Sequence, residues 1–447
     1  MRELPEGWIE CAIQEITNIQ MGQSPDSSTY NDHGEGLAFF QGKAEFGKLY
    51  PTVRKWCIEP KKIAEIGDIL LSIRAPVGPT NIADAKCCIG RGLASVQASS
   101  SVYQMYILYY FKNIESWLSQ QGTGSTFAAV SGDFVRSLHI PLPPLNEQKR
   151  IADRLDQLLT RIDKTKAHLD RIPPLLKRFR QSVLAAATSG KLTEEWREER
   201  SIGRWQEKFG KEVFSTITSG SRGWASYYSD SGAIFLRVGN LDHHTIDLDL
   251  SNIQYVNPPR GAEGERTRIQ LGDILVSITA DVGMVGLIKE DLGEAYINQH
   301  LCLARQTGEF DGKYLAYYFA SPVGGLAQLT ESQRGVTKAG LTLGDIRSIK
   351  ISVPPIEEQQ EIVRRVEALF AKADRIEAQY KNARQQVDRL TPALLAKAFR
   401  GELVPQDPND EPASVLLERV KEARSIAQPA KKGRSRKGPK RNSEHKA

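Results

Sequence analysis

The chain has 447 residues, of which 40% are hydrophobic and 26% are charged, and a formal net charge of +6. This composition is typical of a soluble globular protein, and the length predicts two to four domains. It excludes a membrane-embedded protein, since no stretch approaches the ~18 apolar residues of a membrane span, and residues 1–6 lack the apolar run of a signal peptide.

The positive charge is concentrated at the C-terminal end. Residues 429–447 contain eight lysines and arginines against Glu444 alone, which leaves residues 1–428 with a formal charge of −1. The net charge is therefore no evidence that the folded part binds nucleic acid, and any DNA surface must come from local clustering.

The five cysteines form no C-x-x-C pair, and their number is odd. This pattern argues against a disulfide framework or a zinc site and favours the cytoplasm as the location.

The second half of the sequence repeats motifs of the first half in the same order. GDILLSI at 67–73 matches GDILVSI at 272–278, and YILYYF at 106–111 matches YLAYYF at 314–319. IPLPPLNEQ at 140–148 then matches ISVPPIEEQ at 351–359, and LAAATSGKL at 184–192 matches LAKAFRGEL at 395–403. The chain is therefore an internal duplication. We expect buried strands at 69–73 and 274–278, and amphipathic helices at 106–111 and 314–319.

Each copy ends in a long apolar heptad pattern that begins after a Pro-Pro pair and a Glu-Gln pair. The spacing predicts two coiled-coil helices, interrupted by Pro173-Pro174 in the first copy and by Pro392 in the second. The predicted seam consists of Ile151, Leu155, Leu158, Ile162, Leu169 and Ile172 in the first copy, and of Ile362, Val366, Leu369, Ala373, Ile376, Tyr380, Val387 and Leu390 in the second.

The predicted fold class is α+β, with two globular mixed α/β domains joined by two long antiparallel coiled-coil helices in a pseudo-two-fold arrangement. The predicted segments are a first domain at 1–142, a helical region at 143–192, a linker at 193–202, a second domain at 203–353, a helical region at 354–404, and an extension at 405–447 that ends in a disordered basic tail.

Several of these motifs resemble the specificity subunits of type I restriction–modification systems. They are the LPEGW opening at 4–8, the G-D-I-L strands, the P-P-x-x-E-Q helix starts and the paired L-x-x-A-x-x-G-x-L ends. The resemblance covers about residues 1–404. The second domain departs from it, because it lacks the L-P-x-G-W opening and begins near Trp205.

The resemblance implies a non-catalytic DNA-binding subunit. Each globular part would be a target recognition domain that reads one half of a bipartite DNA sequence, and the helices would fix the distance between the domains. Two methyltransferase subunits would dock on the helices, and restriction subunits would join them. S-adenosylmethionine, ATP and Mg would bind to those partner subunits and not to this chain.

Catalytic motifs occur only as near misses. Asn257-Pro-Pro-Arg260 lacks the aromatic residue that an amino-methyltransferase stacks on a flipped base. Pro25-Asp26 with Glu59-Pro60-Lys61 is a loose nuclease pattern, but Pro60 argues against the strand that it would need. The histidines at 243, 244 and 300 lack metal-binding spacings. We therefore expect no catalytic and no metal site.

Base recognition uses Arg, Lys, Asn and Gln side chains on loops and element ends. The candidates in the first domain are Gln41, Lys43, Arg54, Lys55, Arg74 and Arg91. Those in the second are Arg222, Tyr227, Arg237, Asn240, Arg266, Arg268, Arg334 and Lys338. In the repeat we pair Arg74 with Thr279, and Gly42-Lys43 with Gly239-Asn240.

Two other functions are compatible with the same patterns. One is a single-chain DNA methyltransferase or nuclease, against which the missing cofactor loop argues. The other is a coiled-coil scaffold whose globular heads bind proteins.

Overall fold

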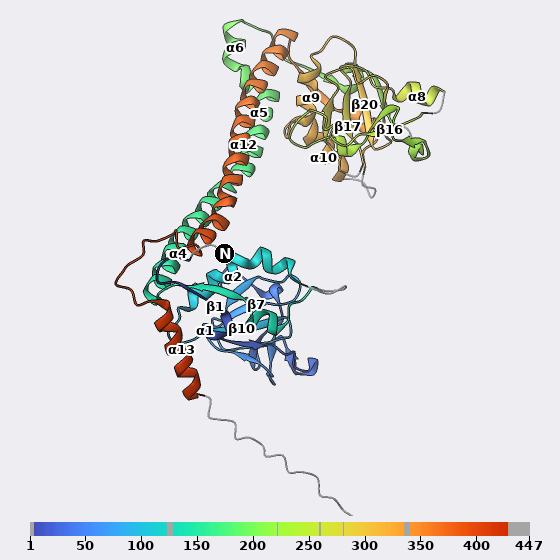
Figure 1. Ribbon diagram of the computed structural model, residues 1–447. Coiled ribbons are helices and arrows are strands. Elements are labelled where there is room, and N and C mark those ends of the chain that lie inside the picture. The colour runs from blue at the N-terminus through green and yellow to red at the C-terminus, as the bar shows by residue number, and fades with distance from the viewer. Residues whose placement is uncertain are drawn as a thin grey trace, which may run out of the picture. The chain divides into compact units, whose positions relative to one another are not determined.

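The computed structural model describes residues 4–122, 128–220, 222–258, 261–279, 281–334 and 340–427 (Figure 1). The chain divides into two compact units: unit 1 comprises Met1–Lys166 and Gln385–Ala447, and unit 2 comprises Ala167–Arg384. Each unit therefore contains one globular domain together with helical segments from both copies of the repeat. In the described ranges, no helix combines the length and the apolar character that a membrane span requires.

The described residues of the domain of unit 1 form three sheets. Their neighbouring strands are, in the first sheet, β1 (Ile9–Ala12) and β11 (His139–Leu142); in the second, β2 (Thr17–Met21), β10 (Leu93–Ala98), β7 (Ile69–Ser72) and β8 (Thr80–Ile82); and in the third, β3 (Tyr30–Asn31), β5 (Trp56–Cys57), β4 (Leu37–Phe40), β9 (Cys87–Ile89) and β6 (Ile63–Ala64). All pairings are antiparallel except that of β4 with β9.

Unit 2 repeats this topology in its described residues, except that its third sheet has no strand equivalent to β6. Its strands are β12 (Gln206–Phe209) with β21 (Lys350–Val353); then β13 (Phe214–Ser219), β20 (Leu301–Gln306), β17 (Ile274–Ser277) and β18 (Val285–Leu287); and β14 (Tyr228–Ser229), β16 (Gln254–Val256), β15 (Ala233–Leu236) and β19 (Ala295–Ile297). Among its described strands the one parallel pair is β15 with β19, the counterpart of β4 with β9. The predicted duplication and the strands at 69–73 and 274–278 are confirmed.

The helices are divided between the two units. Unit 1 contains α1 (Ile13–Ile16), α2 (Gln104–Gln120), α3 (Gly132–Arg136), most of α4 (Leu145–Leu169), and α13 (Ala413–Ala427). Unit 2 contains α5 (Ile172–Thr188), α6 (Glu194–Glu199), α7 (Gly210–Val213), α8 (Ala262–Thr267), α9 (Gly312–Ala320), α10 (Gly325–Arg334) and α11 (Leu343–Ser348). The longest helix, α12 (Ile356–Ala398), contributes to both units.

The segments 106–111 and 314–319 are helical as predicted, but they are not amphipathic. Every residue in both segments is buried. The reason is that each helix is covered on several sides. In unit 1 the Tyr106 hydroxyl donates to the Pro141 carbonyl of β11, the Tyr109 hydroxyl donates to Asp156 of α4, and the Tyr106 ring packs against Phe399.

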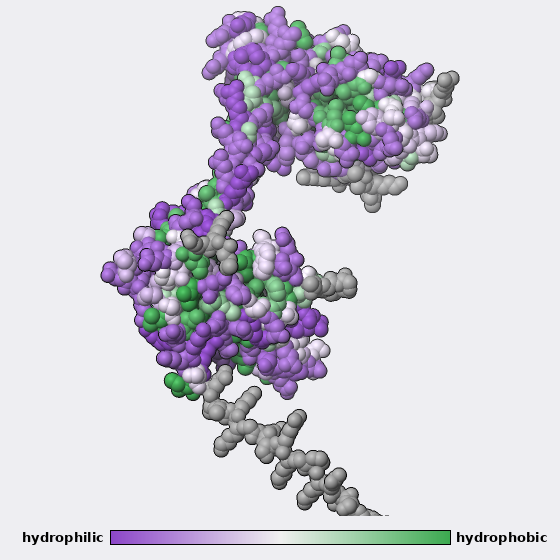
Figure 2. All heavy atoms as spheres, viewed as in Figure 1, coloured by the Kyte–Doolittle hydropathy of each residue, from purple (hydrophilic) through white to green (hydrophobic). Residues whose placement is uncertain are grey.

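Within unit 2, α5 and α12 run antiparallel, as the sequence predicts. Arg180 of α5 pairs with Asp374 and Glu377 at 2.6 and 2.9 Å, and Asp170, just before α5, pairs with Arg384. Residue numbers thus rise on one partner as they fall on the other. In the view of Figure 2, the outer surface of these two helices is mainly hydrophilic.

The predicted seam is buried only in part. Ile151, Leu155, Ile362 and Val366 are fully buried, because they belong to the hydrophobic cores of their domains. Ile162 and Ala373 are also buried, while Leu158, Leu169, Ile172, Leu369, Tyr380 and Val387 are half-buried. The prediction is wrong for Ile376 and Leu390, which are 46% and 45% exposed. The seam residues beside the domains are therefore packed more deeply than those farther along the helices.

The two proline interruptions have different outcomes. The first helix is broken as predicted, since α4 ends at Leu169 and α5 begins at Ile172, with Pro173 and Pro174 in its first turn. First-turn N–H groups have no helical acceptor, so prolines are tolerated there. The second prediction is wrong, because α12 continues through Pro392. A single proline removes one backbone hydrogen bond, and the long helix continues on both sides of it.

Two further segments contain more structure than predicted. The linker at 193–202 includes α6. The extension beyond 404 includes α13, whose Ala413, Leu416 and Val420 are buried in the core of unit 1, and Arg150 pairs with Asp410 at 2.7 Å. The basic tail at 429–447 lies outside the described residues.

The Glu-Gln pair at the start of each long helix explains the duplicated P-P-x-x-E-Q motif. Gln148 accepts from the Tyr103 backbone N–H (2.9 Å) and donates to the Pro143 carbonyl (2.9 Å). Its counterpart Gln359 accepts from the Asp311 N–H (2.9 Å) and donates to the Pro354 carbonyl (2.8 Å). Each glutamine therefore ties its helix start to the entrance of the buried helix of its own domain.

The preceding glutamate binds a tryptophan indole in each unit. The Trp8 Nε1 donates to Glu147 at 3.0 Å, and the Trp205 Nε1 donates to Glu358 at 2.9 Å. The second domain lacks the L-P-x-G-W opening, but it differs only in the residues around the tryptophan, because Trp205 occupies the structural position of Trp8.

The two buried carboxylates differ in their other partners. Glu358 also accepts from Thr193 and from Arg197, both at 2.7 Å. Glu147 has one buried oxygen without a hydrogen-bond partner among the described residues. Burial raises the pKa of Glu147 above its usual value, and the bond from Trp8 opposes that shift.

We expect E358Q to destabilise the protein by about 2–4 kcal/mol at neutral pH. The substitution removes the negative charge that pairs with Arg197 and leaves that guanidinium without its carboxylate partner in a buried site. E147Q should cost under about 1 kcal/mol, because that carboxylate has no buried cation to lose. The measurement is urea unfolding followed by tryptophan fluorescence.

The pH dependence separates the two sites further. Because the folded-state pKa of Glu147 is raised, the folded wild type binds a proton more readily than the unfolded chain does. The wild type should therefore gain stability relative to E147Q as the pH falls through the raised pKa. An equal loss for both variants, independent of pH, would contradict this account.

Candidate nucleic-acid interface

Three strand ends of the first domain are held together by backbone hydrogen bonds. The Gly90 N–H donates to the Phe40 carbonyl (2.8 Å), and the Ile73 N–H donates to the Gly92 carbonyl (2.9 Å). These bonds join the end of β4, the end of β7 and the β9–β10 connection. The next residues are Gln41, Arg74 and Arg91, all exposed. Three of the six predicted residues are thus brought to one place, which we call the strand-end cluster of unit 1.

The same bonds recur in the second domain. The Asn298 N–H donates to the Leu236 carbonyl (3.0 Å), and the Ile278 N–H donates to the His300 carbonyl (3.0 Å). The corresponding residues are Arg237, Thr279 and Gln299, all half-buried. With His300 they form the strand-end cluster of unit 2.

The side chains of the second cluster contact one another. Thr279 Oγ1 lies 2.5 Å from His300 Nδ1, and Gln299 Nε2 lies 3.3 Å from His300 Nε2. The His300 backbone N–H donates to the side chain of Asn298 at 3.2 Å. His300 also lines an open pocket of about 330 Å³ with Arg237, Gly239 and Asn252, among others.

The sequence prediction missed Gln299 and His300. Residues 90–92 and 298–300 are separated by 208 positions, the same separation as that of the buried helices at 106 and 314. Extending the repeat at this separation from Arg91 leads to Gln299. The pairing of Arg74 with Thr279 is confirmed by the strand ends.

The other predicted residues of the first domain lie in segments that follow β4 in the sequence or run beside it. Lys43 is in the short 3-10 helix η2 (Lys43–Glu45) that follows β4, and Arg54 and Lys55 precede β5; all three are exposed. The Lys55 carbonyl accepts from the Phe39 N–H at 2.8 Å, so this segment lies beside β4.

In the second domain Arg222 and Tyr227 are exposed around the 3-10 helix η4 (Trp224–Tyr227). Arg266 binds within the protein, donating to the Ser219 carbonyl at 2.8 Å and to Thr218. Arg268 is exposed, and its backbone forms a bridge with Tyr296. Lys338 and the side chain of Arg334 lie outside the described residues.

Asn240 is a structural residue, and its assignment to DNA contact is wrong. Its side chain is buried, accepts from the Arg237 N–H (2.9 Å) and donates to the Asp249 carbonyl (2.8 Å). The pairing of Lys43 with Asn240 is also wrong. Glu45 makes the equivalent cap in unit 1, accepting from the Gly42 N–H at 3.0 Å. Asn240 therefore corresponds to Glu45, at the end of its 3-10 helix.

The near-miss catalytic residues have structural partners. Asp26 caps the 3-10 helix η1 (Ser27–Thr29), accepting from the Ser28 N–H at 3.0 Å. His243 pairs with Asp281 at 2.7 Å. Burial raises the pKa of Cys87 and Cys302 to about 12, which keeps these thiols protonated at neutral pH. Over the described ranges, no cluster of potential metal ligands is found.

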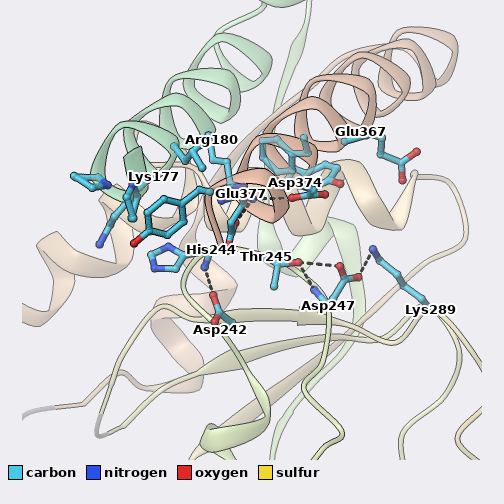
Figure 3. A pocket seen from close by; sticks show the side chains of 17 residues that line it. Lys177, Arg180, Asp242, His244, Thr245, Asp247, Lys289, Glu367, Asp374 and Glu377 are labelled. Atoms are coloured by element: carbon cyan, nitrogen blue, oxygen red, sulfur yellow. Dashed lines mark hydrogen bonds and ion pairs between the residues drawn. The ribbon is translucent and has the colours of Figure 1, made fainter. Parts of the chain in front are cut away.

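A pocket of about 690 Å³ in unit 2 lies between α5, α12 and the segment 242–247 (Figure 3). Five carboxylates line it, against three lysine and arginine side chains: Asp242, Asp247, Glu367, Asp374 and Glu377 face Lys177, Arg180 and Lys289. Since this lining is net acidic, the pocket is a poor site for a DNA phosphate. In unit 1 the aspartate equivalent to Asp374 is Asp163, which pairs with Lys48 at 2.5 Å.

Comparison with known proteins identifies a family. The model of the type I restriction modification DNA specificity domain matches residues 5–173 and 249–384. The chain belongs to this family.

Similar proteins span nearly the whole chain. The specificity subunit of the type I restriction enzyme EcoKI from Escherichia coli K12 is 30% identical over 95% of this chain and 97% of its own length. That of EcoBI from Escherichia coli is 29% identical over 94% and 93%. The HsdS subunit crystal structure from Thermoanaerobacter tengcongensis shares the fold, with a TM-score of 0.56 at 19% identity, covering 90% and 99%.

Family membership makes this chain a DNA specificity subunit rather than a catalytic one. The alternative of a single-chain methyltransferase or nuclease is not supported, because the relatives are specificity subunits over their full length.

Proposed function

We propose that this chain gives a type I restriction–modification complex its DNA target, with each globular domain contacting one half of a bipartite sequence. The observation that carries the proposal is that the backbone arrangement of the strand ends, which we call the frame, occurs in both domains. Both domains hold three strand ends with the same backbone bonds, and they present different polar side chains there. Two readers of two different half-sites require this combination of a shared frame and different contact residues.

The partners follow from the same assignment. Two methyltransferase subunits would bind the helical regions, whose outer surface in unit 2 is largely hydrophilic, and restriction subunits would join them. S-adenosylmethionine, ATP and Mg would be bound by those subunits. The cytoplasm is the proposed location, because the target is double-stranded DNA and the buried cysteines are unpaired.

The purified chain should transfer no methyl group and cleave no DNA, whereas the complex with methyltransferase subunits should methylate a bipartite site. The reason is that the chemistry belongs to the partners. The assay is methyl transfer to plasmid DNA, with the methyltransferase subunits alone as the control. Sequence-specific methylation by the isolated chain would overturn the assignment.

Replacing residues 1–142 with the corresponding domain of another family member should change one half-site and leave the other unchanged. Each domain has its own core and its own strand-end cluster, so base preference should be separable. Methylome sequencing of cells that express the hybrid with its partners measures both half-sites at once. A change in both half-sites would contradict the two-reader proposal.

The helical regions should act as a ruler for the unread bases. Seven residues inserted after Lys166, together with seven after Arg384, preserve the heptad phase and the ion pairs within each unit. At ~1.5 Å per residue they add ~10 Å, or about three base pairs of DNA rise. Methylome sequencing should show the same half-site bases with a longer unread spacer. Full activity on the original spacing would show that these helices do not set the distance.

A further inference from the structure

His300 fixes the hydrogen-bonding capacity of Gln299. An amide nitrogen only donates, so the contact between Gln299 Nε2 and His300 Nε2 makes the imidazole nitrogen the acceptor. The remaining ring proton is then on Nδ1, which donates to Thr279 Oγ1 at 2.5 Å. The imidazole is thus held on both sides, and His300 is a positioning residue for the amide.

The amide of Gln299 keeps one N–H and its oxygen for another molecule. An N–H donor beside a carbonyl acceptor matches the N7 acceptor and the N6 amino donor that adenine presents in the major groove. No other partner for the Gln299 side chain is found in the part of the chain that the structure describes. The cluster is also next to open space, since His300 and Arg237 line the 330 Å³ pocket.

The first domain has different chemistry at the same positions. Arg91 stands where Gln299 does, and Arg74 stands where Thr279 does. Gly92 replaces His300, and a Cβ on Gly92 would lie 2.2 Å from the Gln41 carbonyl oxygen, so no positioning side chain fits there. Both guanidiniums are exposed, and neither has a hydrogen-bond or ion-pair partner among the described side chains. A guanidinium in this setting suits the O6 and N7 acceptors of guanine.

We propose that Arg91 reads a guanine in the half-site of the first domain, and that Gln299, positioned by His300, reads an adenine in the half-site of the second. This inference rests on the proposed function, because it assigns bases to two domains already taken to bind DNA. It makes positions 91 and 299 the structurally equivalent specificity determinants of the two domains.

The test exchanges the two residues in the full chain, assembled with its methyltransferase subunits. R91Q and Q299R are compared with the wild type by methylome sequencing, and by competition binding with duplexes that each carry one altered base pair. K86Q and Q270R are the matched controls. Lys86 directly precedes β9, whereas Arg91 follows it, and Gln270 is exposed beside the start of β19. Each control makes the same charge change at the opposite end of the strands.

We expect R91Q to reduce discrimination at one guanine of the first half-site by roughly ten- to a hundredfold, and Q299R to do so at one adenine of the second. In each variant the untouched half-site reports that the chain still folds and assembles. Q299A, which removes both the N–H donor and the carbonyl acceptor of the side-chain amide without adding bulk, should lose the same adenine preference. Unchanged base preferences in R91Q and Q299A would overturn the inference, while a wild type without a bipartite site would overturn the proposed function instead.

The role of His300 is tested separately. H300A should lower discrimination at the adenine read by Gln299 and leave the first half-site unchanged. H300Q retains an amide oxygen that can accept the same bond, so it should keep more of that discrimination than H300A. If H300A and H300Q reduce affinity for all duplexes equally, His300 is not a positioning residue for base recognition.

Discussion

The bond between an indole and a buried carboxylate at the start of each long helix is the constraint on which both units depend. A buried carboxylate is stable only with donors around it, and Trp8 and Trp205 supply the shared one. The adjoining glutamine joins the same helix start to the entrance of the buried helix. Domain entry, helix start and domain core are therefore fixed at one point, and neither domain can shift along its helix without breaking these bonds.

The two copies have kept this frame and diverged around it. Glu358 gains Thr193 and Arg197 as donors, whereas Glu147 has no arginine bond and a raised pKa. Unit 1 receives instead the buried face of α13 against its core. Each copy therefore obtains its remaining stability from different elements, although the order of the shared strands and the helix-start bonds are the same.

The sequence predicted those features that depend on local pattern. The strands at 69–73 and 274–278 follow from short apolar runs, and the duplication follows from motifs repeated in order. Tertiary context decided the rest. The helices at 106 and 314 are buried all round because β strands and long helices cover them, and α13 is anchored by contacts that no periodicity reveals. Asn240 looked like a base reader by residue type alone, yet its amide completes a turn.

Asn240 shows why residue type and loop position are weak guides to a base-contacting side chain, and the backbone bonds of the strand ends supply a second criterion. Reading a base edge requires a donor or acceptor placed to within about half an ångström. A side chain on a strand end whose backbone is bonded to two neighbours starts from a fixed backbone position, whereas a lysine on an unconstrained loop does not. The bonds from Gly90 and Asn298 to their neighbouring strands involve only main-chain atoms. Side chains at 91 and 299 can therefore differ without disturbing the frame, which allows the same fold to recognise different sequences.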